Sequence, residues 1–171
     1  MSFNPNLKIG VLGGGQLGRM MIQSAIDFNL DIHVIDPDVN APCKSIATTF
    51  QVGGLADYDA VYAFGQDKDV ITVEIESVNI DALVKLEGEG KKVYPDTNSL
   101  SIIQDKGLQK QFYSDNNIAT SSFDLFENTE AIKSAINSGT VIFPFVQKLR
   151  TGGYDGKGVA VIKNEADLDL L

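Results

Sequence analysis

Cysteine is almost absent from this sequence, since Cys43 is the only one in 171 residues. A single thiol excludes an internal disulfide and a cysteine-ligated zinc or iron–sulfur site. A lone cysteine usually serves as a small packing residue, so we expect no chemical role for Cys43.

Long apolar runs and basic residues are also scarce. No run approaches the roughly 20 apolar residues that span a bilayer, and residues 1–7 lack the pattern of a signal peptide, which predicts a cytoplasmic protein without membrane contact. The 14 Lys and Arg residues face 23 Asp and Glu residues, giving a formal net charge of −9. Such an acidic chain is unsuited to nucleic acid and favours a small-molecule or protein partner.

The composition is that of a globular protein, with 43 % apolar and 22 % charged residues. Up to about residue 95, short apolar runs alternate with helical periodicity, which predicts an α/β fold: a doubly wound, Rossmann-like parallel sheet with helices on both faces. The expected elements are strands at 8–12, 31–36, 47–52, 70–75 and 93–94, and helices at 16–29, 56–64 and 80–89.

One face of the first predicted helix is apolar by its spacing of three and four, and we expect this face to cover the sheet. Its residues are Leu17, Met20, Met21, Ser24, Ala25 and Phe28.

The pattern changes after Pro95, which indicates a boundary near residues 95–105. We predict a first domain over residues 1–100 and the beginning of a second over residues 101–171. Its expected elements are helices at 97–103 and 106–116, a further helix from residue 129, and strands at 141–149 and 159–162 around a glycine-rich hairpin loop at 150–158.

Three glycines follow the first strand in the spacing G-x-G-x-x-G: Gly13, Gly15 and Gly18. Asp36 ends the second strand. The pattern is typical of a dinucleotide-binding turn, because glycines let the backbone approach a ligand and a helix N-terminus attracts an anion. The same turn also suits close strand–helix packing or another phosphorylated or polar ligand, so all three interpretations stay open from the pattern alone.

Two carboxylates, Glu74 and Glu76, lie at the predicted end of a buried strand and are expected on one face of the sheet. The structural interpretation leaves one exposed and lets the other cap the helix that starts near Asn79. The functional interpretation is that one of them holds an amine or hydroxyl of a substrate, because open α/β sheets bind ligands at the carboxyl ends of their strands.

Basic residues gather around the hairpin loop of this acidic chain, namely Lys148, Arg150 and Lys157. A glycine-rich hairpin beside a lysine on a strand suits nucleotide phosphates. The alternative is a connector without a ligand. The Walker sequence G-x-x-x-x-G-K-[ST] is absent, which excludes a P-loop.

Four segments together resemble the 5-(carboxyamino)imidazole ribonucleotide synthase family of the ATP-grasp superfamily: residues 11–20, 73–76, 104–110 and 147–158. The resemblance implies a pre-ATP-grasp substrate-binding domain followed by the start of an ATP-grasp small lobe. It implies ATP-dependent carboxylation of aminoimidazole ribonucleotide with bicarbonate, through carboxyphosphate, in purine biosynthesis. It also implies a homodimer at full length.

The resemblance further implies three sets of site residues. Aminoimidazole ribonucleotide would be contacted by Gly15, Gln16, Leu17 and Glu74. ATP would be contacted by Lys106, Lys148, Gly153, Gly156 and Lys157. Tyr154 and Asp155 would be catalytic, with Asp155 orienting bicarbonate or the amine.

Members of this family are longer, and their Mg²⁺ ligands and adenine contacts follow the hairpin. We therefore expect the Mg²⁺ ligands outside this chain, and we expect an N-terminal portion that is inactive alone. The alternative from another class is an NAD(P)-binding oxidoreductase or regulatory module that uses the glycine turn and Asp36. The absence of a Tyr-x-x-x-Lys or similar catalytic set weighs against it.

Overall fold

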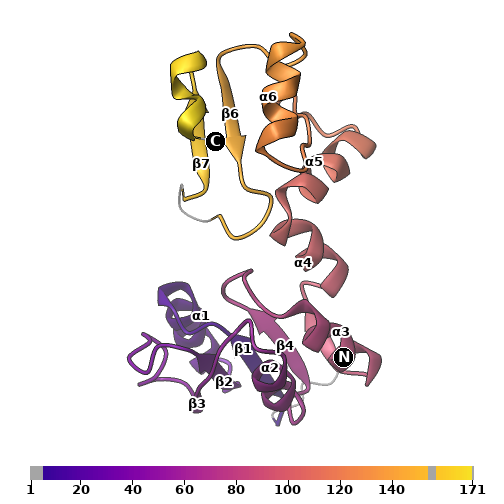
Figure 1. Ribbon diagram of the computed structural model, residues 1–171. Helices are drawn as coiled ribbons and strands as arrows, with labels where there is room; N and C mark the ends of the chain where they lie inside the picture. Colours follow the sequence, from indigo (N-terminus) through magenta and orange to yellow (C-terminus); the bar gives the residue numbers. More distant parts are fainter. Residues whose placement is uncertain (1–5, 154–156, 171) are drawn as a thin grey trace. The chain divides into compact units, whose positions relative to one another are not determined.

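The computed structural model describes residues 6–153 and 157–170. The chain divides into two compact units, Met1–Ser101 and Ile102–Leu171. Figure 1 shows the elements of both units in chain order. Each unit is described by itself.

The first unit is built on a five-stranded parallel sheet in the order β3-β2-β1-β4-β5. Its strands are β1 (Lys8–Leu12), β2 (Asp31–Asp36), β3 (Thr49–Val52), β4 (Val70–Val73) and β5 (Lys92–Tyr94). β1 is central, and its last residue, Leu12, pairs with Ile35 on one side and Val73 on the other. The carboxyl ends of these three strands therefore meet at one edge, where open α/β sheets bind ligands.

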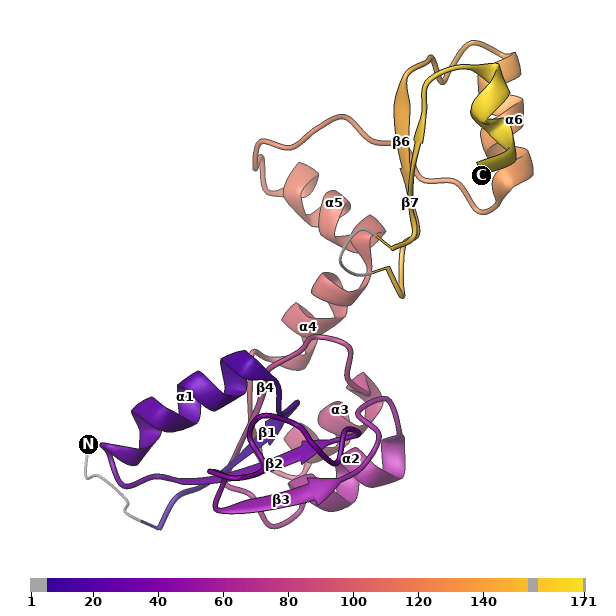
Figure 2. The ribbon, with the colours of Figure 1, turned by 90° about the vertical axis from the view of Figure 1, so that its left-hand side faces the viewer.

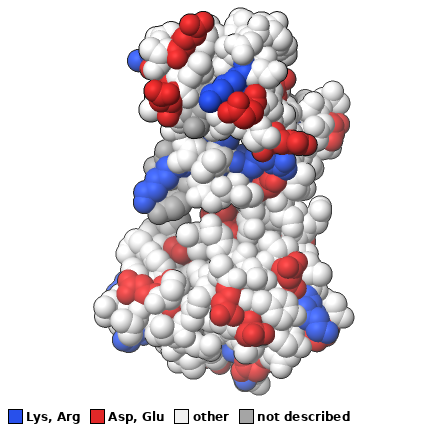
Figure 3. Space-filling model, viewed as in Figure 1, with Lys and Arg blue, Asp and Glu red and all other residues white. Residues whose placement is uncertain are grey.

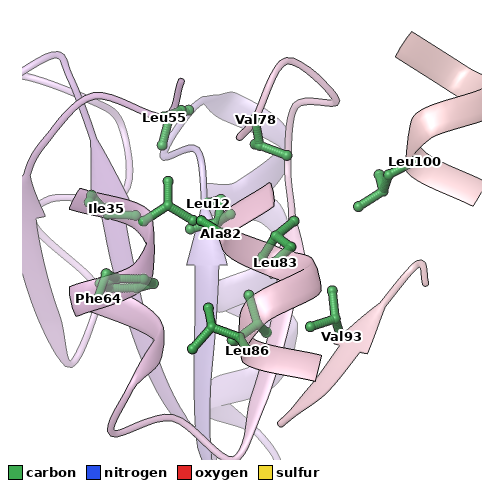
Figure 4. Packing of buried hydrophobic residues seen from close by; sticks show 12 residues of the cluster. Leu12, Ile35, Leu55, Phe64, Val78, Ala82, Leu83, Leu86, Val93 and Leu100 are labelled. Carbon is green, nitrogen blue, oxygen red and sulfur yellow. The ribbon is translucent and has the colours of Figure 1, made fainter. Parts of the chain in front are cut away.

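Helices cover both faces of this sheet, which confirms the predicted doubly wound α/β class (Figure 2). They are α1 (Gln16–Ile26), α2 (Tyr58–Gly65) and α3 (Ile80–Gly88). Neighbouring strand residues point to opposite faces. Val11 thus packs in the core under α1, and Leu12 packs in the core under α2 and α3, which Figure 4 shows closely.

The buried face of α1 differs from the prediction. Gly18, Ile22 and Ala25 are buried, whereas Leu17 and Phe28 are 68 % and 67 % exposed. Only Ala25 was placed correctly among the buried positions. The contact is centred on Gly18, where an added Cβ would lie 3.1 Å from Cys43 Sγ. A glycine adds no apolar signal, so hydrophobic periodicity assigned the contact to the wrong side of the helix.

Local capping explains where α2 and α3 begin. The side chain of Asp57 accepts a hydrogen bond from the Ala60 N–H, and that of Asn79 accepts one from the Ala82 N–H. These bonds satisfy N–H groups that the first helical turn leaves without a partner. β4 ends at Val73, two residues before its predicted end, so Glu74 and Glu76 follow the strand and its alternation of faces does not apply to them.

The second unit contains helices and one antiparallel hairpin. α4 (Thr97–Gln104) begins in the first unit, where Leu100 packs in the core, and ends in the second. The elements that follow it are α5 (Lys106–Asp115), α6 (Thr129–Asn137), β6 (Phe145–Lys148), β7 (Val159–Ile162) and the 3₁₀ helix η1 (Glu165–Leu170). β6 pairs with β7 from Phe145 opposite Ile162 to Lys148 opposite Val159. Within the described part of this unit, the buried apolar side chains are Ile132 and Ile162. A core this small supplies little hydrophobic stabilisation.

Two surface properties bear on function. On the face shown in Figure 3, acidic and basic side chains form small separate groups with uncharged surface between them. Within residues 6–153 and 157–170, no helix combines the length and the apolar character that crossing a membrane requires.

Candidate functional site

The glycine turn between β1 and α1 lies at the carboxyl edge of the sheet. Gly13 has φ of +103°, a conformation that side chains disfavour. Its N–H donates to the carbonyl of Ile35 at 2.9 Å, which holds the turn against β2. Gly15 is the N-cap of α1, so the first turn of that helix starts directly from this loop.

Asp36 is part of the scaffold of this turn. Its Oδ2 accepts the Gly14 N–H at 2.6 Å, and its Oδ1 accepts the Asp38 N–H at 2.7 Å. In a dinucleotide site the corresponding carboxylate accepts from the ribose hydroxyls. Both oxygens of Asp36 instead hold the backbone of the protein, one to the glycine turn and one to the turn that begins before Pro37.

Glu74 reaches the glycine turn from the end of β4. Its N–H donates to the Leu12 carbonyl at 2.8 Å. Its carboxylate lies so close to the turn that a Cβ added at Gly15 would stand 2.6 Å from Oε1, and one added at Gly13 would stand 2.9 Å from Oε2. The structure therefore brings together two of the predicted substrate residues, Gly15 and Glu74.

The other predicted substrate residues, Gln16 and Leu17, form the exposed first turn of α1. A carboxylate beside a helix N-terminus is favoured by the helix dipole. Glu74 therefore supplies the negative charge at the place where a dinucleotide would put its pyrophosphate. The arrangement suits a hydrogen-bond donor such as an amine or a hydroxyl. Glu76, the second carboxylate of the predicted pair, is exposed.

Cys43 lies against this glycine turn, a contact that the sequence did not predict. The Cys43 N–H donates to the Gly14 carbonyl at 3.0 Å, and its Sγ lies 3.5 Å from the Gly15 carbonyl oxygen. Burial raises the pKa of the Cys43 thiol, and the carboxylates of Glu74 and Asp36 raise it further. Cys43 therefore acts as a protonated packing residue. No sequence signal indicated that this loop folds onto the turn.

A second group of predicted residues lies at the start of α5 and around the hairpin. The Lys106 N–H donates to the Arg150 carbonyl at 2.9 Å, and its Nζ donates to the Gly153 carbonyl at 2.9 Å. Asp105, the N-cap of α5, accepts from the Arg150 guanidinium at 2.6 Å. Lys106 and Gly153 are among the residues expected from the sequence, whereas this ion pair is not.

The other two lysines predicted to bind ATP are exposed. Lys148 is exposed at the end of β6, opposite Val159, and Lys157 is exposed before β7. Tyr154, Asp155 and Gly156 lie outside the described residues. Across the part of the chain that the structure covers, no group of three or more His, Cys, Asp or Glu side chains could hold a metal ion.

Comparison with known proteins decides the family. Residues 7–104 match the ribonucleotide synthetase preATP-grasp domain. The chain belongs to this preATP-grasp family. Residues 111–171 match the ATP-grasp domain, so both units have counterparts in the ATP-grasp superfamily. The resemblance drawn from the four sequence segments is confirmed.

Individual relatives of this preATP-grasp chain are named for the same family of enzymes. A phosphoribosylaminoimidazole carboxylase of Candida glabrata is 37 % identical over 166 residues, which are 94 % of this chain and 29 % of that protein. The crystal structure of N5-carboxyaminoimidazole ribonucleotide synthetase from Thermotoga maritima is 36 % identical with a TM-score of 0.83, over 96 % of this chain and 43 % of that one.

A third relative carries ligands. The N5-carboxyaminoimidazole synthase of Aspergillus clavatus, in complex with ADP and aminoimidazole ribonucleotide, is 29 % identical with a TM-score of 0.83. The alignment covers 97 % of this chain and 43 % of that one. The preATP-grasp chain thus spans less than half the length of the relatives it matches.

Proposed function

We propose that this chain forms the substrate-binding domain and the first part of the ATP-grasp domain of an enzyme that carboxylates aminoimidazole ribonucleotide. The domains proposed are residues 1–100 and 101–171. The reaction uses ATP to activate bicarbonate as carboxyphosphate and then transfers the carboxyl group to the exocyclic amine. The observation that carries the proposal is the Glu74 carboxylate beside the glycine turn. The relatives of the chain are named as carboxylases or synthetases of this ribonucleotide.

Glu74, with Gly15, Gln16 and Leu17, binds aminoimidazole ribonucleotide at the carboxyl edge of the sheet. A carboxylate accepts hydrogen bonds from amines and hydroxyls, and the ligand has both. Glycine at position 15 leaves room for Glu74, because an added Cβ would meet its carboxylate at 2.6 Å.

ATP binds at the hairpin through Lys106, Lys148 and Lys157, with Gly153 and Gly156 in the loop. Phosphoryl transfer depends on positive charge around the phosphates, which lysines supply. Lys106 Nζ donates to the Gly153 carbonyl, but an ammonium has three N–H groups, so it can keep this bond and also contact a phosphate.

Asp155 and Tyr154 are the proposed catalytic residues, by resemblance to the family. Asp155 orients bicarbonate or accepts a proton from the attacking amine, a role suited to a carboxylate. The Mg²⁺ that accompanies ATP is proposed to take its ligands from outside residues 1–171. Bicarbonate as the carboxyl source, a homodimer and a cytoplasmic location are further parts of the proposal.

The competing function, NAD(P) binding, is disfavoured by two observations on the glycine turn. Both oxygens of Asp36 already accept backbone N–H groups, at 2.6 and 2.7 Å. The Glu74 carboxylate stands beside Gly13 and Gly15, where it would repel a pyrophosphate.

The test uses the complete natural polypeptide that contains residues 1–171. ADP release is measured with and without aminoimidazole ribonucleotide and bicarbonate, and NAD(H) binding is measured by calorimetry. We expect ADP release that needs both co-substrates, and its loss in Asp155→Ala with an unchanged melting temperature. NAD binding in the micromolar range, about −8 kcal/mol, with no such ADP release would replace this proposal with the oxidoreductase.

A further inference from the structure

Asp105 joins two segments of the second unit that are 45 residues apart in sequence. Its Oδ2 accepts from Arg150 Nη2 at 2.6 Å, and its Oδ1 accepts from Arg150 Nε at 3.0 Å. Oδ1 also accepts the N–H groups of Gly107 at 2.7 Å and Leu108 at 3.1 Å. One carboxylate thus caps α5 and binds a guanidinium in the two-pronged geometry that fixes orientation most strongly.

Two further bonds join the same segments. The main-chain carbonyl of Arg150 accepts the Lys106 N–H at 2.9 Å, and the carbonyl of Gly153 accepts from Lys106 Nζ at 2.9 Å. Lys106 directly follows Asp105, and Arg150 lies two residues after the end of β6 at Lys148. The first turn of α5 and the start of the hairpin loop therefore form one hydrogen-bonded assembly.

Gly107 makes the close approach possible. It is buried, and a Cβ added there would lie 2.7 Å from Arg150 Nε and 3.1 Å from Arg150 Cζ. The guanidinium consequently lies against the helix backbone, and any side chain at position 107 would displace it.

The ion pair differs from an ordinary surface pair. The Asp105 side chain is 19 % exposed, whereas Glu130, in the i,i+3 pair with Lys133, is 82 % exposed. The Arg150 guanidinium and the two backbone N–H groups hold the pKa of Asp105 below its usual range. Asp105 therefore stays charged at neutral pH. Arg150 is neutralised by it, so the positive charge left at the loop comes from the lysines.

We propose that Asp105 and Arg150 are positioning residues for the nucleotide. The pair sets the spacing between Lys106, at the start of α5, and Lys148, two residues before Arg150. In this role neither residue of the pair needs to contact a phosphate. The inference rests on the proposed function, because it assigns the role of the pair through the ATP contacts of the two lysines.

The test compares steady-state kinetics of variants in the complete natural polypeptide. Asp105→Asn removes the charge but keeps a good N-cap residue, and Arg150→Gln removes the guanidinium. We expect each to raise the KM for ATP at least tenfold, with kcat and the KM for aminoimidazole ribonucleotide changed less than threefold. The double variant should exceed neither single variant by more than threefold, because both remove one interaction.

Two matched variants complete the design. Glu130→Gln removes a carboxylate from the exposed pair in the same unit and should leave every constant within twofold. Gly107→Ala keeps α5 helical but displaces the guanidinium, so it should also raise the KM for ATP, and it serves if the charge variants fail to fold. Melting temperatures are recorded for all variants.

Lys148→Ala separates the two hypotheses. If Lys148→Ala leaves the KM for ATP unchanged, Lys148 is not an ATP contact, and both the proposed ATP site and the inference that rests on it are overturned. If Lys148→Ala raises that KM while folded Asp105→Asn, Arg150→Gln and Gly107→Ala variants match Glu130→Gln, the pair is merely structural and the inference is overturned.

Discussion

Gly15→Ala is the sharpest probe of the proposed substrate site. Gly15 has φ of −71° and ψ of −165°, an extended conformation that alanine adopts without strain. Its effect therefore comes from the new methyl group. That methyl would stand 2.6 Å from Glu74 Oε1 and 3.1 Å from Oε2, whereas ordinary contact begins at 3.4 Å. The carboxylate oxygen must move by 3.4 − 2.6 = 0.8 Å.

The cost to stability is modest and the cost to binding is larger. Moving the end of a flexible side chain off its preferred rotamer costs about 0.5–1.5 kcal/mol. Alanine is also a poorer N-cap than glycine, by roughly 0.5–1 kcal/mol. A hydrogen bond to a charged group contributes about 1.5–3 kcal/mol, so a misplaced Glu74 should weaken aminoimidazole ribonucleotide binding roughly 10- to 100-fold.

The assay is calorimetric titration of the complete polypeptide with aminoimidazole ribonucleotide, together with urea unfolding. Gly88→Ala is the matched control, because Gly88 lies in α3 and an added Cβ there meets nothing within 4 Å. This control variant should bind aminoimidazole ribonucleotide normally, and its unfolding midpoint should lie at an equal or slightly higher urea concentration. Normal binding by a folded Gly15→Ala variant would refute the role assigned to Glu74.

Two further predictions concern the first unit. In Gly65→Ala the new methyl would overlap Leu86 Cδ1 in the core. Overpacking of about 1–3 kcal/mol should outweigh a helix-propensity gain of up to about 1 kcal/mol, and unchanged stability in urea would contradict this. Burial, and then the charge of Lys68, lower the pKa of His33 below its usual 6.5. The unfolded chain then binds the proton more readily, so stability should fall as the pH drops below 6.5 and stay level above it; His33→Gln should flatten this slope in urea titrations between about pH 5.5 and 7.5, and an unchanged slope would show that His33 is not its source.

Much of the first unit followed from short-range pattern. The strands at 8–12 and 31–36 match β1 and β2, and the alternation of strands and helices predicted the doubly wound class. These features depend on residues one to four positions apart, which a sequence displays directly. The location of Glu74 near the glycine turn also followed, because the carboxyl ends of neighbouring parallel strands share an edge.

Other features could not be predicted because they depend on long-range contacts. The rotation of α1 about its axis places Gly18 against Cys43, and the exposed apolar stripe with Leu17 and Phe28 was the stronger signal in sequence. Asp36 had the right place for a ribose-binding carboxylate, yet it binds the Gly14 N–H across 22 residues. Its hydrogen-bond partners decided its role.

The sequence by itself determined the order of the elements, the places where glycine allows close approach, and the family to which the chain belongs. Tertiary structure decided which face of α1 is buried, that Asp36 holds the protein's own backbone, and that Asp105 binds Arg150. The physical reason is that periodicity and turn chemistry act over a few residues, whereas a carboxylate binds whichever donors the packed chain brings within about 3 Å.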